Sequence, residues 1–271
     1  MVSRVFFSAV VFVLLFSFSG IAQLKLCAWN IQNFGKSKSD SEIVYMAGLL
    51  REFDVVGIVE VVAGRGGSQA VARLADELNR TGNKWDYLVS DATSGSGSQS
   101  ERYACLWKTA RVKRVGEAAL EKSYAEEMQR EPFYVGFLYN NRSFTLALFH
   151  AIPKNRQPET EIKYLKLIQA RDSSKNLIFA GDFNCPQSHT VFNPLKSRGY
   201  KPGLINCKTT IKMKPKGTQC LASEYDNIFY DAARIKLLKS GVVAFYKDFP
   251  TLTTARRISD HLPVWMELEF R

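Results

Sequence analysis

The stretch Leu177–Asn184, with the sequence LIFAGDFN, is the most informative part of the chain for the fold. Its first half, Leu177 to Ala180, is short and rich in branched and aromatic residues, which is typical of a buried β-strand. Polar Asp182 and Asn184 follow where this strand should end. Side chains at strand ends are held rigidly and still reach solvent, so layered α/β folds place functional sites there.

Short apolar runs of the same kind alternate with amphipathic patterns along the chain. Further strands are predicted at 24–29, 55–61, 103–107, 133–139, 144–149, 227–230 and 264–270. Helices are predicted at 42–53, 68–78 and 159–170, the first of them after the capping candidates Asp40 and Ser41. Asn140-Asn141-Arg142 between two strands indicates a hairpin, and therefore mixed sheets. Residues 90–100 and the Lys-rich segment 207–220 are predicted to be loops.

Composition places the chain among ordinary globular proteins. It has 271 residues, 46% hydrophobic and 23% charged, which excludes disorder, collagen and coiled coils. Residues 1–22 contain Arg4, a nearly unbroken apolar run and small residues up to Ala22, which predicts a secretory signal peptide. The alternative, a membrane anchor, would need an apolar run of about 18 to 20 residues. We therefore expect one secreted domain over 23–271, extracellular or periplasmic, monomeric and without stable membrane association.

The formal charge of +11 predicts an anionic partner, either nucleic acid or acidic lipid. Part of this charge is concentrated in one stretch that contains Lys208, Lys212, Lys214 and Lys216. Charge runs are often only solvated surfaces, so this feature favours a polyanionic substrate weakly.

Acidic, amide and histidine side chains gather at the ends of the predicted strands. Two of the three histidines in the chain are among them. The residues at these positions are Asn30, Glu60, His150, Asp182, Asn184, Asp260 and His261.

The motifs around these residues resemble those of the deoxyribonuclease I family, within the endonuclease/exonuclease/phosphatase superfamily. They occur in the family's order: Trp29-Asn30-Ile31-Gln32-Asn33-Phe34-Gly35, Val59-Glu60-Val61, Ser100-Glu101-Arg102-Tyr103, Arg130-Glu131-Pro132, Phe149-His150, Gly181-Asp182-Phe183-Asn184, Tyr225-Asp226-Asn227-Ile228 and Ser259-Asp260-His261-Leu262-Pro263. The resemblance implies a four-layer α/β sandwich, in which two mixed β-sheets pack face to face with helices on both outer sides. It also implies a metal-dependent endonuclease that hydrolyses DNA phosphodiester bonds with low sequence specificity and leaves 5′-phosphate ends.

Phosphodiester hydrolysis needs a deprotonated water, a protonated leaving group and neutralised phosphoryl oxygens. His261 is the predicted general base and His150 the predicted general acid, because imidazole can take either part near neutral pH. The family pattern pairs Glu101 with His150 and Asp226 with His261. Each carboxylate would orient its histidine.

The remaining residues offer oxygen ligands and phosphate donors. Hard oxygen ligands without a thiolate favour Mg²⁺, with Mn²⁺ or Ca²⁺ as alternatives. Asp182 would hold the metal or position the attacking water, Asn184 would donate to a phosphate oxygen, and Arg130 would clamp a flanking phosphate. The predicted metal ligands are Asn30, Glu60, Asp260 and Asp182.

Two positions depart from the family pattern. Members that grip the DNA minor groove carry Arg two residues after the equivalent of Glu60 and Tyr two residues before the equivalent of Glu101, where this chain has Val62 and Gln99. A preference for duplex DNA over single strands or RNA is therefore open. Arg65 either reaches the groove from a flexible loop or belongs to a solvated turn.

The five cysteines are compatible with secretion. The family resemblance implies a bridge between Cys185 and Cys220, while the close spacing of Cys207 and Cys220 makes that pair an alternative. Cys27 and Cys105 lie within predicted strands and are expected to be buried thiols.

Two other functions compete with a nuclease. One is a different secreted phosphoesterase of the superfamily, such as a sphingomyelinase or a nucleotide phosphatase, because the core chemistry would be shared. No long apolar hairpin of the kind that enters a membrane is evident in the sequence. The other is a non-catalytic protein that binds extracellular DNA through its basic surface.

Overall fold

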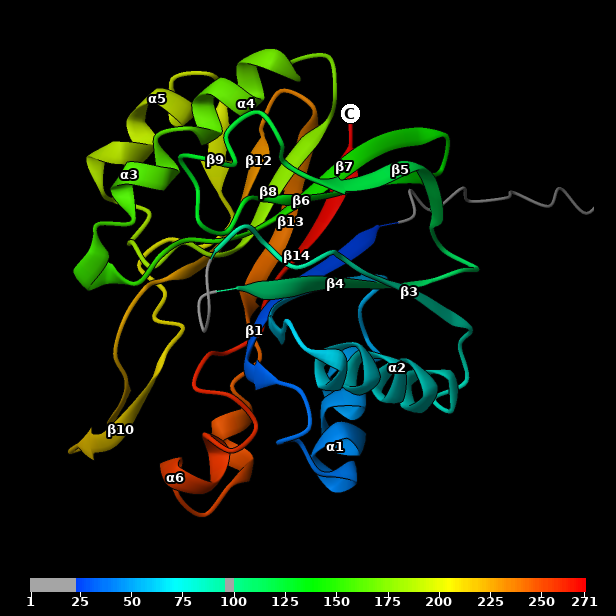
Figure 1. Cartoon of the computed structure of the whole chain (residues 1–271), viewed down its shortest axis with the longest axis vertical. Helices are drawn as coiled ribbons and strands as arrows, with labels where there is room; N and C mark the ends of the chain where they lie inside the picture. Colours follow the sequence, from blue (N-terminus) through cyan, green and yellow to red (C-terminus); the bar gives the residue numbers. More distant parts are fainter. Residues whose placement is uncertain (1–22, 96–99) are drawn as a thin grey trace, which may run out of the picture.

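Two six-stranded sheets face each other in the computed structural model, which describes residues 23–95 and 100–271 (Figure 1). The predicted signal peptide, 1–22, lies outside these residues. The first sheet has the order β13-β14-β1-β2-β4-β3, with β1 (Leu24–Phe34), β2 (Val55–Val62), β3 (Trp85–Val89), β4 (Glu101–Lys108), β13 (Ile235–Val242) and β14 (Val264–Phe270). The second has the order β5-β6-β7-β8-β12-β9, with β5 (Lys113–Leu120), β6 (Phe133–Tyr139), β7 (Arg142–His150), β8 (Leu177–Asp182), β9 (Tyr200–Pro202) and β12 (Asp226–Asp231).

Both sheets are mixed. β1 and β2 are parallel, as are β7 and β8, while the other pairs are antiparallel. The predicted hairpin joins β6 to β7, and Asn140 and Asn141 in its turn have φ values of 47° and 60°. These left-handed angles are those that a tight two-residue hairpin requires.

Helices cover the outer face of each sheet. The first sheet packs against α1 (Asp40–Leu50), α2 (Arg65–Asn79), α6 (Leu252–Ala255) and the 3₁₀ turn η4 (Phe245–Asp248). The second packs against α3 (Glu159–Ile162), α4 (Leu165–Arg171), α5 (Asn193–Lys196) and η3 (Thr190–Phe192). A further 3₁₀ turn, η2 (Lys154–Arg156), follows β7. Among the described residues, no helix has the length and apolar character needed to cross a membrane.

Strand alternation explains why four layers form. In β1, Leu24, Leu26 and Ala28 join the core between the sheets, while Cys27 and Trp29 pack on the helix side. Because both faces of the central strands are apolar, each sheet must be covered on both sides. The predicted four-layer α/β sandwich is confirmed.

The two sheets approach closely at Gly57 of β2. A Cβ atom there would lie 2.2 Å from Cδ2 of Leu148, on β7 of the opposite sheet. Only a residue without a side chain allows this approach.

Several sequence expectations are corrected. The N-cap of α1 is Ser39, rather than Asp40 or Ser41, and it forms a capping box with Glu42. The third predicted helix is divided into α3 and α4 at Lys163 and Tyr164. The segment 207–220 is a hairpin of β10 (Ile211–Lys216) and β11 (Gln219–Leu221) rather than a loop.

The cysteines are all free thiols, so neither predicted bridge, Cys185–Cys220 or Cys207–Cys220, is present. The physical reason is their separation among layers. Cys185 lies in the core under α3 to α5, Cys207 packs against the core between the sheets, and Cys220 is on the projecting β10–β11 hairpin. Cys27 and Cys105 are buried, as expected.

Candidate active site

The predicted site residues come together at one edge of the sandwich. Asn30, Glu60, His150 and Asp182 lie at or near the carboxyl ends of β1, β2, β7 and β8. Glu101 and Asp226 begin the antiparallel neighbours β4 and β12, so they lie at the same edge. Polar side chains therefore meet where the apolar strands end.

Glu60 owes its position to an irregular backbone. The pairing register of β2 shifts between Ile58 and Val61, and Glu60 has a φ of 63°. Residues other than glycine rarely adopt this conformation, and such strain is concentrated at functional sites. The resulting bulge places Oε1 of Glu60 3.3 Å from Nδ2 of Asn30.

His150 forms the first imidazole–carboxylate pair. Its Nδ1 lies 2.9 and 3.0 Å from the two carboxylate oxygens of Glu101, so an N–H at Nδ1 donates to Glu101. Its Nε2 is directed toward Nη1 of Arg130, at 2.9 Å. Burial lowers the pKa of His150, as does the charge of Arg130, but the charge and hydrogen bond of Glu101 together with the charge of Asp182 hold that pKa above its ordinary value.

His261 forms the second pair. Its Nδ1 lies 2.8 Å from Oδ2 of Asp226, which also accepts a hydrogen bond from the Thr209 hydroxyl at 2.6 Å. Burial lowers the pKa of His261, but the carboxylates of Asp226 and Asp182 raise it to about 10. The pKa of Asp226 is itself raised by burial, against the opposing effect of His261.

Asp182 connects the two pairs. Its Oδ2 lies 3.5 Å from Nε2 of His150 and 3.7 Å from Nδ1 of His261. The same oxygen accepts a hydrogen bond from Nδ2 of Asn30 at 3.0 Å. Both imidazoles therefore border one buried carboxylate, as a shared reaction centre would require.

The potential ligand atoms around Asn30 suit a divalent cation. Its amide nitrogen faces the carboxylates of Glu60 and Asp182, while its Oδ1 is buried without a hydrogen-bond partner among the described residues. If the amide were turned over, three oxygens would face one point, an arrangement that a hard cation stabilises. Asp182, Asp226 and His261 form an overlapping group whose potential ligand atoms lie within 4.8 Å of one another.

Arg130 and Asn184 lie within the centre. Arg130 contacts His150, the Ala151 carbonyl and, at 3.4 Å, the Glu101 carboxylate. Asn184 has a φ of 48°, and its backbone N–H donates to Oδ1 of Asp182 at 2.8 Å while its side-chain amide donates to the Ala151 carbonyl. Their predicted phosphate contacts remain predictions.

Asp260 and Arg65 are the remaining predicted site residues. Asp260 accepts from Gln32 and Arg256, each at 3.1 Å. Arg65 is exposed and begins α2, so the predicted flexible loop is wrong. The start of this helix packs tightly against the end of β2, because a Cβ atom at Gly67 would lie 2.0 Å from the Val62 carbonyl oxygen. Val62 is exposed, and Gln99 lies outside the described residues.

Sequence reasoning missed Thr209 and the part played by Ser259. Thr209 falls in the segment expected to be a loop, where nothing in the pattern marks it. Ser259 belongs to a quoted motif; its hydroxyl donates to the Asn30 carbonyl at 2.7 Å and accepts from the His261 N–H at 3.1 Å. It thereby links the end of β1 to the His261 segment.

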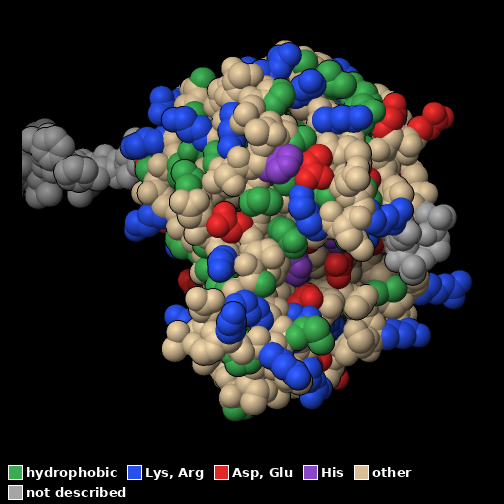
Figure 2. All heavy atoms as spheres, turned by 90° about the vertical axis from the view of Figure 1, so that its left-hand side faces the viewer, with side chains coloured by type: hydrophobic (Ala, Val, Ile, Leu, Met, Phe, Trp, Pro, Cys, Tyr) green, Lys and Arg blue, Asp and Glu red, His purple; other side chains and the backbone are tan. Residues whose placement is uncertain are grey.

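The centre opens into a hollow of about 560 Å³ lined by Gln32, Glu60, Glu101, Arg130 and neighbouring residues. Figure 2 shows carboxylate and histidine side chains in a hollow of the surface, with Lys and Arg side chains around it.

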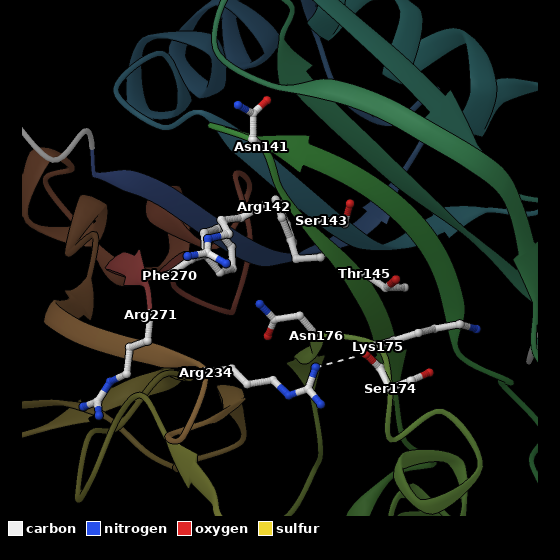
Figure 3. Close-up of a pocket in the computed structure, with 11 residues that line it drawn as sticks. Asn141, Arg142, Ser143, Thr145, Ser174, Lys175, Asn176, Arg234, Phe270 and Arg271 are labelled. Atoms are coloured by element: carbon white, nitrogen blue, oxygen red, sulfur yellow. Dashed lines mark hydrogen bonds between the residues drawn. The ribbon is translucent and has the colours of Figure 1, made fainter.

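A second hollow, of about 430 Å³, lies at the opposite ends of the same strands, where Arg142 begins β7 (Figure 3). Two of its cations are paired with acids, Lys175 with Asp172 and Arg234 with Asp231. Arg234 also donates to the Ser174 carbonyl (Figure 3).

Known proteins resemble this chain in sequence and in fold. Residues 27–261 match the model of the Endonuclease/Exonuclease/phosphatase family. The chain is 28% identical to "Deoxyribonuclease" of Thioalkalivibrio sp. (strain K90mix), covering 96% of this chain and 75% of the relative. It is 27% identical to "Deoxyribonuclease-1" of Bos taurus, covering 94% and 97%.

Among solved structures, a similar fold occurs in an endonuclease/exonuclease/phosphatase family protein from Bacteroides thetaiotaomicron. The TM-score is 0.66 at 17% identity, and the alignment covers 92% of this chain and 98% of the other. At this identity the likeness concerns the fold alone.

Proposed function

Because the chain belongs to the Endonuclease/Exonuclease/phosphatase family, we propose that it is a secreted, divalent-metal-dependent endonuclease that hydrolyses DNA with low sequence specificity and leaves 5′-phosphate ends. The observation that carries this proposal is the placement of two imidazole–carboxylate pairs around Asp182. The deoxyribonuclease names of the relatives support DNA as the substrate. The signal-like sequence of residues 1–22 supports secretion.

Each imidazole–carboxylate pair would carry out one of the two proton transfers of the reaction. Glu101 holds the N–H of His150 at Nδ1, so Nε2 is the atom that would protonate the leaving oxygen. Its raised pKa favours the protonated form that an acid needs, and in that form Nε2 would exchange its contact with Nη1 of Arg130 for one with the leaving oxygen. Asp226 holds Nδ1 of His261 in the same way, and Nε2 of His261 would take the proton from water.

The groups around Asp182 would bind the charged phosphate and a cation. Asn30, Glu60 and Asp182 would hold a divalent ion, with Asp260 and Asp226 at its margins. This ion would offset the negative charge of the phosphoryl oxygens. It would also offset the charge of the carboxylates that keep His261 protonated. Arg130 would donate to a phosphate oxygen from the floor of the hollow. Such phosphate contacts position a strand without reading its bases, so low sequence specificity follows.

A plasmid-nicking assay tests the proposal. We expect His150→Ala to lower the rate about 10²- to 10⁴-fold, because the proton donor is lost. His189→Ala is the matched control, since His189 is the third histidine and pairs with Glu159 outside the centre. The parent should lose activity in chelator and recover it with Mg²⁺.

The alternatives are separated by a substrate panel of plasmid, RNA, sphingomyelin and a nucleotide monophosphate. Cleavage of sphingomyelin or the monophosphate alone would assign a different phosphoesterase activity. Binding of plasmid without any cleavage would indicate a DNA-binding protein. A His150→Ala variant as fast as the parent would contradict the acid assignment.

A further inference from the structure

The hairpin β10–β11, residues 208–221, is a basic arm beside the active site. It contains Lys208, Lys212, Lys214 and Lys216, and no Asp or Glu occurs between residues 208 and 223. Lys214 and Lys216 are exposed and Lys212 is half-buried. Within the part of the chain that the structure describes, none of these four lysines forms an ion pair. Figure 1 shows β10 extending away from both sheets.

The base of the arm is attached directly to the segment that carries His261. Thr210 and His261 form an isolated β-bridge. On its two sides, the Ile211 N–H donates to the Asp260 carbonyl and the Leu262 N–H to the Thr209 carbonyl, each at 2.7 Å. Thr209 also bonds Asp226, the partner of His261. The direction in which the arm leaves is therefore fixed relative to the reaction centre.

We infer that the arm binds the backbone phosphates of the nucleic acid that flanks the scissile bond on the His261 side. This inference rests on the proposed nuclease function and adds where the substrate runs. Unpaired lysines on an exposed strand attract phosphates and release counterions when they bind. Because the arm is attached rigidly, phosphates bound to it would align the nucleic acid strand with the reaction centre, and would not only raise the local concentration of the substrate.

The length of the arm sets the reach of these contacts. At about 3.4 Å per residue, Lys212 and Lys216 lie at most about 7 and 20 Å along the arm from the Thr210–His261 bridge. Phosphates of one strand of duplex DNA are spaced about 3.4 Å along the axis, so for a substrate that runs along the arm the lysines would cover about two to six nucleotides from the cleaved bond. Shorter substrates would not reach them.

A hollow lies between the arm and residues 246–253. It measures about 600 Å³ and is lined by Met213 and Lys214 of the arm and by Tyr246 and Lys247 of η4, among others. Met213 is 78% exposed. Lysines mixed with an aromatic ring and an apolar side chain suit the phosphates, sugars and bases of a nucleic acid strand.

The test compares two triple variants that remove equal charge. The arm variant is Lys212→Gln, Lys214→Gln and Lys216→Gln. The control is Lys113→Gln, Arg142→Gln and Lys175→Gln, at the opposite ends of the strands, where Figure 3 shows Arg142 and Lys175. Binding of a duplex of about 30 base pairs is measured by fluorescence anisotropy in EDTA, without cleavage, over a range of salt concentrations.

We expect the arm variant to bind at least about tenfold more weakly at low salt, with the slope of log Kd against log salt reduced by about 2 to 3. The control should change this slope by less than about 1. KM for plasmid should rise with the arm variant, while kcat/KM for bis(p-nitrophenyl) phosphate, which is too small to reach the arm, should stay within about twofold. Replacing the three arm lysines with Arg should restore binding.

Equal slopes for the arm variant and the control would overturn the inference, as would equal losses on plasmid and on the small diester. Failure of the proposed function looks different. In that case the parent would hydrolyse neither plasmid nor the small diester with any metal. If instead the parent cleaves both substrates and the arm variant binds duplex like the parent, only the inference about the arm is wrong.

Discussion

Asp182 illustrates how single residues balance charge in the centre. This carboxylate is buried, yet an amide and two imidazoles surround it within 3.7 Å. A buried charge is tolerable only when such partners compensate it, and removing one partner leaves the others uncompensated. The carboxylates that we propose to support catalysis therefore also depend on the histidines for stability.

Glu121 provides a test of charge pairing away from the centre. Its buried carboxylate accepts from Arg171 at 2.7 and 2.9 Å, from the Tyr134 hydroxyl at 2.6 Å and from the Ser123 N–H at 2.7 Å. Burial by itself would raise the pKa of Glu121, but these donors lower it to about 2. A carboxylate with a lowered folded-state pKa stabilises the fold above its unfolded pKa, about 4.3.

We therefore expect Glu121→Gln to lower the free energy of unfolding at pH 7 by about 1 to 3 kcal/mol, because Arg171 is partly exposed and its contribution is screened. The difference from the parent should shrink as the pH falls from about 4.3 to about 2. Urea unfolding at several pH values measures this. Exposed Glu126→Gln is the control, and a pH-independent difference for Glu121→Gln would contradict the charge explanation.

At the level of elements, the sequence identified the central strands and missed the edges. The runs 24–29, 55–61, 133–139 and 177–180 all lie within observed strands. The missed strands β3, β5, β9 and β13 are the four edges of the two sheets. Edge strands have one unpaired side and more solvent contact, so they lack the dense apolar pattern that predicts a strand.

The start of α1 yields a prediction at this scale. Ser39 accepts from the Glu42 N–H, and Glu42 accepts from the Ser39 N–H, which satisfies two donors at the helix end. Ser39→Ala should lower the free energy of unfolding by about 1 kcal/mol. Ser41→Ala, at one of the two capping candidates that the sequence indicates, should cost less than about 0.5 kcal/mol. Denaturant unfolding distinguishes the two variants, and a larger loss for Ser41→Ala would contradict Ser39 as the N-cap.

For the whole molecule, the arrangement of the sandwich separates two surfaces of different character. β7 begins at Arg142 and ends at His150, so its two ends are about 26 Å apart. The reaction centre and the basic arm lie at one end, and the hollow of Figure 3 lies at the other. The net charge of +11 attracts polyanions generally, and the arm then directs them to one end.

Metal binding can be tested as a property of the whole molecule without measuring activity. A ligand that binds only the folded state adds about 1.4 kcal/mol at ten times its Kd. We expect Mg²⁺ at that level to raise the Tm of the parent by about 3 to 6 °C. Glu60→Gln should abolish most of this shift, while exposed Glu117→Gln should keep it. An equal shift in both variants would place the ion elsewhere.

The amino-acid sequence alone determined which residues are polar at the ends of apolar strands, since that follows from local pattern and motif order. Asn30, Glu60, His150, Asp182 and His261 were all identified in this way. Folding decided what these residues touch: the bulge that turns Glu60 inward, the support of Asp226 by Thr209, and the attachment of the basic arm to His261. These contacts join segments distant along the chain, and local periodicity carries no information about such pairings.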